Sequence, residues 1–174
     1  MDLKRYDLMQ DINARGTYVF SKHAIPHLKR AENPHVLTLS PPLSLDPKWA
    51  KGQVGYTIAK YGMSLCTLGM AEEFRDDGIA FNSLWPRTLV ATAAVQNLLG
   101  GDEAMARARK PEVYSDAAYA VLTRPSRECT GNFFLCEDVL VEEGVTDFEA
   151  YAAAPGADPQ VDLYVDDVNP PGMG

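Results

Sequence analysis

The fold is decided by two short apolar runs, His35-Val36-Leu37-Thr38-Leu39 and Ile79-Ala80-Phe81-Asn82-Ser83-Leu84-Trp85, and by the helical pattern between them. Turn residues close each run, Ser40-Pro41-Pro42 after the first and Pro86 after the second, as is typical of buried strands. Residues 54–75 carry apolar side chains at helical spacing. A strand, a helix and a second strand in this order predict two parallel strands joined by a crossover helix.

The same alternation continues outward from this unit. Residues 4–29 show helical periodicity, and Pro26 is expected to kink that helix or shift its last turn. A weaker helix is expected at 92–98, another helix at 111–123, and a third strand at 131–136. The pattern therefore predicts an α/β fold with a narrow parallel sheet, one of whose edges needs a cover.

The last part of the chain has a different composition. Beyond Ala150 it is rich in Pro, Gly and Asp. We expect residues 1–150 to form the folded domain and residues 151–174 to form an extended or disordered acidic tail. A solvated extension is the commoner state of such a segment, although it could also bind a basic partner.

Net charge excludes several classes of partner. The chain carries a formal charge of -8, and no Lys or Arg follows Arg127. Such a field repels phosphate backbones and anionic lipids, so neither nucleic acid nor a membrane surface is expected as a partner. No apolar run approaches the length of a membrane-spanning helix, and the first residues lack the apolar core of a secretory signal. The three cysteines fit neither a disulfide framework nor a zinc pattern, which favours the cytoplasm.

Tyr56-Thr57-Ile58-Ala59-Lys60 is the segment most indicative of chemistry. Residues four apart share a helix face, so the phenol of Tyr56 and the ammonium of Lys60 can project into one site. A phenol with a pKa of about 10 is a poor base at neutral pH, but a cation within about 4–6 Å favours the phenolate. Such a pair can transfer the proton that carbonyl reduction or alcohol oxidation requires. Taken alone, a Tyr-x-x-x-Lys spacing usually belongs to an exposed pair of side chains with no catalytic role.

Four segments in this order resemble the short-chain dehydrogenase/reductase family. They are DINARGTY at 11–18, HVLTLSPPL at 35–43, YTIAKYGMS at 56–64 and NSLWPRT at 82–88. The resemblance spans roughly residues 4–150. It implies the C-terminal part of a Rossmann-type parallel sheet with crossover helices and about three of the family's strands. It also implies NAD(P)-dependent interconversion of a small-molecule carbonyl and alcohol, with a lipid-like or fatty-acyl substrate by analogy.

The resemblance assigns roles to individual residues. Tyr56 is the implied general acid/base, and Lys60 is implied to lower its pKa while holding the nicotinamide ribose. Asn13 is implied to hold a water in the proton relay, and Ser40 to polarise the substrate carbonyl. The implied contacts to the cofactor, NAD or NADP, are Tyr56, Lys60, Pro86, Thr88 and Thr92.

Two positions depart from the family pattern. Pro41 stands where the family's serine normally falls, with Ser40 one position early and Ser44 three positions late, so either serine is a candidate. Ser40 is equally well explained as a strand-end residue that caps the loop. Arg87 replaces the usual glycine after Pro86, which predicts a less tightly turned loop.

The family's Gly-x-x-x-Gly-x-Gly phosphate loop is not found in these residues. The resemblance starts at the family's mid-chain helix, and we therefore expect this chain to lack the adenosine pocket and to bind NAD(P) weakly or not at all. Two hypotheses follow. One is a short-chain dehydrogenase/reductase-type oxidoreductase. The other is a non-catalytic or pseudoenzyme chain that self-associates, as a homodimer or larger assembly, through the helices at 4–29 and 54–75.

His23 and His27 have the i, i+4 spacing that can bind zinc. No third ligand is apparent in the sequence, so a polar helix face is the better interpretation, and no metal site is expected.

Overall fold

The computed structural model describes residues 1–171. The chain divides into two compact units. The first unit comprises residues 1–84 and 124–134, and the second begins with residues 85–123 and resumes at residue 135.

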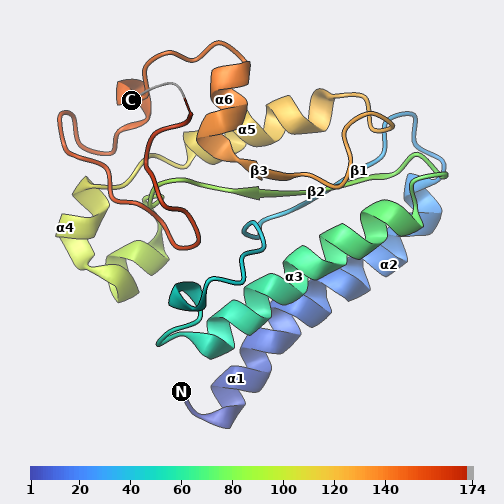
Figure 1. Ribbon diagram of the computed structural model, residues 1–174, viewed down its shortest axis with the longest axis horizontal. Coiled ribbons are helices and arrows are strands. Elements are labelled where there is room, and N and C mark those ends of the chain that lie inside the picture. Colours follow the sequence, from blue (N-terminus) through green and yellow to red (C-terminus); the bar gives the residue numbers. More distant parts are fainter. Residues whose placement is uncertain (172–174) are drawn as a thin grey trace. The chain divides into compact units, whose positions relative to one another are not determined.

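A long helical segment opens the first unit (Figure 1). It consists of α1 (Leu3–Gln10), a π-helical turn η1 (Asp11–Arg15) and α2 (Gly16–Leu28). Pro26 lies inside α2, which continues past it to Leu28. The helix predicted at 4–29 is therefore confirmed. Its departure from α-helical geometry lies at η1, far from the proline.

Most of a three-stranded sheet belongs to the first unit, and its strand order is β1 (His35–Thr38), β2 (Ala80–Trp85) and β3 (Phe133–Leu135). β1 and β2 are parallel, with His35 opposite Ala80 and Thr38 opposite Ser83. Every residue of β2 is buried, as expected of a central strand covered on both faces. The predicted α/β fold with crossover helices is confirmed.

The crossover between β1 and β2 is α3 (Val54–Glu73), preceded by a short 3-10 turn η2 (Pro47–Trp49). α3 packs against α1, η1 and α2, and the figure shows it running alongside them (Figure 1). Gly78, at φ 73°, makes the left-handed turn into β2. The core beneath α3 consists of Met70, Ala71, Ile79 and Phe81.

The second unit is mainly helical. Its elements are η3 (Val95–Leu99, a π-helical turn), α4 (Gly101–Ala106), α5 (Glu112–Thr123), α6 (Cys136–Glu142) and the 3-10 turn η4 (Glu149–Tyr151). The helix predicted at 111–123 is confirmed as α5. The weaker helix predicted at 92–98 is confirmed as a short helical segment at 93–99 that includes η3, and Gly100, at φ 143°, ends it as expected. The predictions did not include α4 and α6.

The acidic tail is extended but not a free solvated segment. Val161 pairs with Thr88, Gln160 accepts a hydrogen bond from the Leu89 amide at 2.9 Å, and Tyr164 is buried. Residues 172–174 of the predicted tail lie outside the described residues.

Candidate functional site

Tyr56 and Lys60 lie one turn apart on α3, and both side chains are partly buried. The Lys60 ammonium donates to the main-chain carbonyl of Leu39 at 3.1 Å and lies 3.8 Å from the Met63 sulfur. Leu39 directly follows β1, so the cation is held at the carboxyl end of a parallel strand. Ligands of open α/β sheets bind beside this end of the strands.

A second Tyr-x-x-x-Lys pair lies on α2, at Tyr18 and Lys22. There the phenol ring is 49% exposed and the ammonium lies 6.0 Å from the ring centroid. No strand end is fixed by a hydrogen bond from Lys22. The two pairs share the same spacing but differ in burial and in the hydrogen bond from Lys60 to Leu39.

Ser40 is enclosed in a chain of hydroxyl groups. Its side chain has no exposed surface, and its Oγ lies 2.9 Å from the Oγ of Ser83, which in turn donates to Thr67 at 3.1 Å. This arrangement ties the end of β1 to β2 and to α3. It gives the Ser40 hydroxyl a structural partner and no surface for a substrate.

Ser44, the other candidate serine, is partly exposed on the loop after β1. The Tyr61 hydroxyl donates to its carbonyl at 3.0 Å, and its Oγ accepts a hydrogen bond from the Asp46 amide at 3.2 Å. Burial raises the pKa of Tyr61; the Ser44 hydrogen bond opposes this, and the Asp46 charge adds to it. Ser44 belongs to a pocket of about 220 Å³ lined by Ser44, Leu45, Asp46, Pro47, Trp49, Ala50, Thr57 and Tyr61.

Asn13 occupies the middle of the π-helical turn η1. Its side-chain amide donates to the Met9 carbonyl at 2.9 Å, one turn back along the helix. The wide turn frees main-chain groups that a regular helix would pair, a feature frequent at functional sites. The carbonyl oxygen of the Asn13 side chain accepts no hydrogen bond from residues 1–171.

In the second unit, the loop that follows β2 is held by the first turn of α6. The Arg87 amide donates to Glu137 Oε2 at 2.8 Å, and the Arg87 guanidinium forms a two-pronged ion pair with Asp138 at 2.6 and 2.8 Å. Thr88 has no exposed surface and donates to Glu137 Oε1 at 3.1 Å. Arg87 therefore anchors the loop rather than loosening it.

The cofactor contacts expected in this loop differ in exposure. The Thr88 hydroxyl is already used by Glu137. Thr92 is exposed, and its Oγ1 accepts a long hydrogen bond from the Val95 amide at 3.4 Å. Pro86 is buried. Of these three residues, Thr92 is the one whose side chain presents surface to a ligand.

The sequence analysis did not identify Glu137, the most enclosed carboxylate of this network. It has no exposed surface, and Arg109 Nε lies 3.3 Å from its Oε1. Burial raises the pKa of Glu137, although the hydrogen bonds from Arg87 and Thr88 and the charge of Arg109 act to lower it. Burial also lowers the pKa of Arg109. The signal in the sequence was Cys136-Glu137-Asp138, two acids that directly follow an apolar strand.

Two glycines of α3 serve the packing of the helix. A Cβ added to Gly55 would lie 2.6 Å from the Met1 side chain, and one added to Gly62 would lie 2.7 Å from Ala14. These glycines permit close packing of α3 against the N-terminal helices. Gly100 and Gly101 form the turn between η3 and α4.

A family model described as enoyl-(acyl carrier protein) reductase matches residues 1–131. The chain belongs to the short-chain dehydrogenase/reductase family. This short-chain dehydrogenase/reductase chain is 52% identical over 164 residues to hydroxysteroid dehydrogenase-like protein 2 of Danio rerio and 48% identical over 164 residues to that of Homo sapiens. The matches cover 94% of this chain but 39% and 38% of those relatives.

Solved structures agree with this family assignment. A short-chain dehydrogenase of Mycobacterium thermoresistibile has a TM-score of 0.90 and 64% identity, covering 99% of this chain and 61% of that one. A putative dehydrogenase of Xanthomonas campestris has a TM-score of 0.90 and 48% identity, covering 95% and 60%. The angucycline C-6 ketoreductase LanV, solved with bound NADP, shares the fold at a TM-score of 0.63 and 16% identity, covering 78% and 54%.

Within residues 1–171, no group of three or more His, Cys, Asp or Glu side chains is placed to hold a metal ion. Both His23 and His27 are exposed on α2. In the same part of the chain, no helix combines the length and apolar character needed to cross a membrane. All three cysteines are free thiols, and Cys129 and Cys136 are buried as small core residues.

Proposed function

We propose that Tyr56 and Lys60 are the proton-transfer pair of a short-chain dehydrogenase/reductase-type oxidoreductase that interconverts a carbonyl and an alcohol. The observation that carries the proposal is the Lys60–Leu39 hydrogen bond of 3.1 Å, which holds the cation at the carboxyl end of β1 on the helix that bears Tyr56. In reduction, the Tyr56 hydroxyl donates its proton to the substrate oxygen, and the Lys60 charge stabilises the phenolate that remains.

Asn13 and Ser44 complete this proposed site. The free side-chain oxygen of Asn13 is a suitable acceptor for a water that resupplies the proton. Since the Ser40 hydroxyl is enclosed, we assign polarisation of the substrate carbonyl to Ser44, whose side chain is partly exposed.

The proposed substrate is an apolar, lipid-like or fatty-acyl carbonyl. The description of the matching family model, enoyl-(acyl carrier protein) reductase, and the name of the relatives, hydroxysteroid dehydrogenase-like protein 2, support this class. So do Leu39, Leu43 and Leu45, which leave apolar surface exposed next to Ser44. The proposed cofactor is NAD or NADP, by analogy with the solved structure of LanV with bound NADP, and its proposed contacts in the first unit are Tyr56 and Lys60. Three free thiols support the cytoplasm as the proposed compartment.

The test follows oxidation of NADPH, and separately of NADH, by the 174-residue chain in the presence of acetoacetyl-CoA as the carbonyl probe. Tyr56→Phe and Lys60→Met should abolish the turnover. Tyr18→Phe and Lys22→Met remove the matched pair on α2 and should retain it. If the unmodified chain shows no turnover and no energy transfer from tryptophan to NADH at millimolar cofactor, the result contradicts this proposal and favours a non-catalytic chain.

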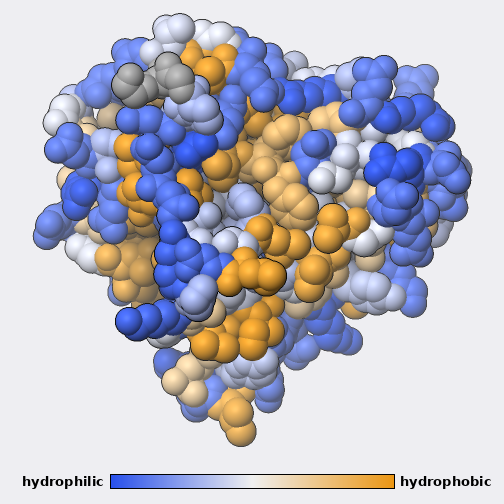
Figure 2. Space-filling model, viewed as in Figure 1, coloured by the Kyte–Doolittle hydropathy of each residue, from blue (hydrophilic) through white to orange (hydrophobic). Residues whose placement is uncertain are grey.

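That second hypothesis is a non-catalytic chain that self-associates. Its support is the apolar surface of the first unit, where large side chains on the helices remain exposed: Leu8, Ile12, Phe20, Ile58, Leu65 and Leu68. Figure 2 shows apolar residues gathered on one face of the molecule. A surface of this kind favours a partner, and we propose a homo-oligomer through α1, α2 and α3. Sedimentation at micromolar concentration should give a dimer or larger species, and a compact monomer would contradict this.

A further inference from the structure

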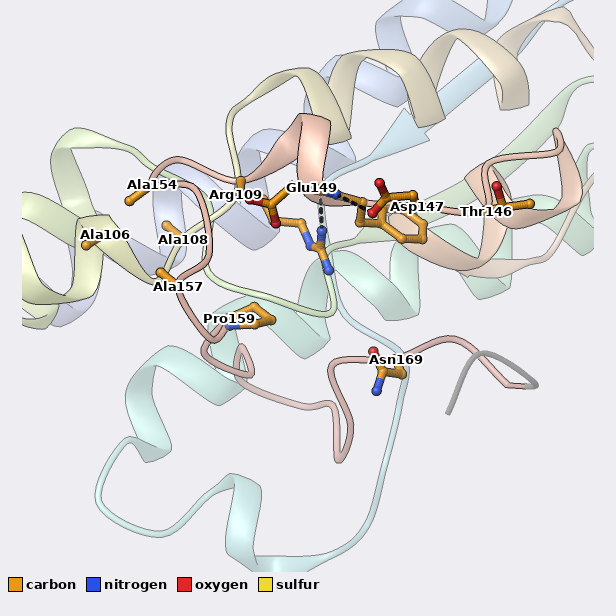
Figure 3. Close-up of a pocket in the computed structure, with 12 residues that line it drawn as sticks. Ala106, Ala108, Arg109, Thr146, Asp147, Glu149, Ala154, Ala157, Pro159 and Asn169 are labelled. Carbon is orange, nitrogen blue, oxygen red and sulfur yellow. Dashed lines mark hydrogen bonds between the residues drawn. The ribbon is translucent and has the colours of Figure 1, made fainter.

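A cavity of about 250 Å³ lies within the second unit (Figure 3). One wall is made of small apolar residues: Ala106, Ala108, Ala152, Ala154, Ala157 and Pro159. The other wall is polar, with Arg109, Thr146, Asp147, Glu149 and Asn169. This volume suits a small metabolite rather than a drug-sized ligand.

Arg109 is the central polar group of the cavity. Its residue is 7% exposed, and its guanidinium stacks 4.7 Å from the Phe148 ring. Nη1 donates to the Phe148 carbonyl at 3.1 Å, and Nε faces Glu137 at 3.3 Å without hydrogen-bond geometry. Nη2 has no hydrogen-bond partner among residues 1–171, and Figure 3 shows the end of the guanidinium directed toward the space between Pro159 and Asn169.

Two carboxylates lie on the same polar wall. One oxygen of Asp147 accepts the Glu149 amide at 2.9 Å, and one oxygen of Glu149 accepts the Gly156 amide at 2.8 Å. The second oxygen of each carboxylate accepts no hydrogen bond from residues 1–171. The wall therefore combines one buried cation that has spare donors with two anions that have spare acceptors.

We propose that this cavity binds a small zwitterion, an aliphatic amino acid whose carboxylate pairs with Arg109 and whose ammonium pairs with Asp147, next to Glu149. A plain anion pairs with Arg109 but meets two carboxylates, and a plain amine leaves the spare donors of Arg109 unpaired. A zwitterion pairs with the Arg109 guanidinium and with a carboxylate at the same time. Its short aliphatic part rests against the wall of alanines and Pro159.

The probe is 4-aminobutyrate, compared with butyrate and butylamine, which each keep one of its charges. Methyl NMR signals of Ala106, Ala154 and Ala157 should shift with 4-aminobutyrate at millimolar concentration. The two analogues should bind about tenfold or more weakly, the loss expected for one charge-assisted hydrogen bond. The proposal is overturned if butyrate binds as tightly as 4-aminobutyrate. It is also overturned if the methyl signals stay unchanged with 4-aminobutyrate, L-alanine and β-alanine.

Three variants sharpen the test. Asp147→Asn preserves the acceptor for the Glu149 amide while removing the charge, and should weaken 4-aminobutyrate binding about tenfold. Glu128→Gln makes the same change in charge in the first unit and should leave the affinity unchanged. Ala157→Leu fills the cavity from its apolar wall and should abolish binding without touching Arg109. Equal affinities for Asp147→Asn and Glu128→Gln overturn the role of Asp147.

Discussion

The hydroxyl groups of Ser40 and Ser83 lie 2.9 Å apart, and neither side chain has exposed surface. Ser83 also donates to Thr67, so it is the middle member of a buried chain of three hydroxyls. Removing one member of a buried hydrogen-bonded pair leaves the other hydroxyl unpaired and lowers stability. Replacing both members by apolar groups costs less. The serine expected at the substrate is therefore part of the connection between β1, β2 and α3.

Ser40→Ala should lower the free energy of unfolding by about 1 kcal/mol, because Ser83 keeps Thr67 as a partner. Ser83→Ala should cost about 1–3 kcal/mol, because it leaves Ser40 unpaired in the interior. Urea denaturation of both single variants and of the double variant measures these values, and the double variant should cost less than the sum. Equal losses of unfolding free energy for the two single variants would contradict Ser83 as the middle member of the three hydroxyls.

Two glycines of α3 should respond oppositely to alanine. A Cβ at Gly62 would lie 2.7 Å from the Ala14 Cβ, so Gly62→Ala should destabilise the chain by about 1–3 kcal/mol. Nothing lies within 4 Å of a Cβ at Gly69, so Gly69→Ala should stabilise the helix by up to about 1 kcal/mol. Thermal unfolding of the pair checks both signs. A neutral Gly62→Ala would mean that α3 does not pack tightly on η1.

Glu137 should make stability depend on pH. Burial raises its pKa above the ordinary value of 4.5, so the folded state holds this proton more tightly than the unfolded state does. Its contribution is fully present below about pH 4.5 and is lost as pH rises through the raised pKa. Glu137→Gln removes this titration and also the counter-ion of Arg109, and should cost several kcal/mol.

The stability difference between the parent chain and Glu137→Gln should accordingly be largest at low pH and shrink as pH rises from about 4.5. Denaturant unfolding at a series of pH values measures this difference. A difference that grows with pH would contradict a raised pKa for Glu137.

Tyr164 should anchor the tail. Its ring meets Trp85 edge-on at 5.9 Å between centroids, and Trp85 Nε1 donates to the Leu163 carbonyl at 2.8 Å. Tyr164→Ala should cost about 3–5 kcal/mol and shift Trp85 emission to the red as water enters. Tyr164→Phe retains the ring contact and should change the emission little. Emission is read in a Trp49→Phe background, and an unchanged spectrum for Tyr164→Ala would contradict packing of the tail.

Local patterns in the sequence were sufficient to predict most of the architecture. The long N-terminal helix, α3, α5 and the three strands followed from periodicity and from turn residues such as Gly78, because helix and strand periods are properties of neighbouring residues. The four ordered segments around Tyr56 and Lys60 also predicted the family correctly, since their spacing is itself part of the sequence.

Tertiary contacts decided the rest. Whether Ser40 faces a substrate or Ser83, and whether Glu137 is a solvated acid or an enclosed one, depends on residues about 40 to 50 positions away. The short helix α6 and the packed tail depend on the same long-range partners. Burial sets the energy of a hydroxyl or a carboxylate, and burial arises only when distant segments come together, which no local pattern specifies.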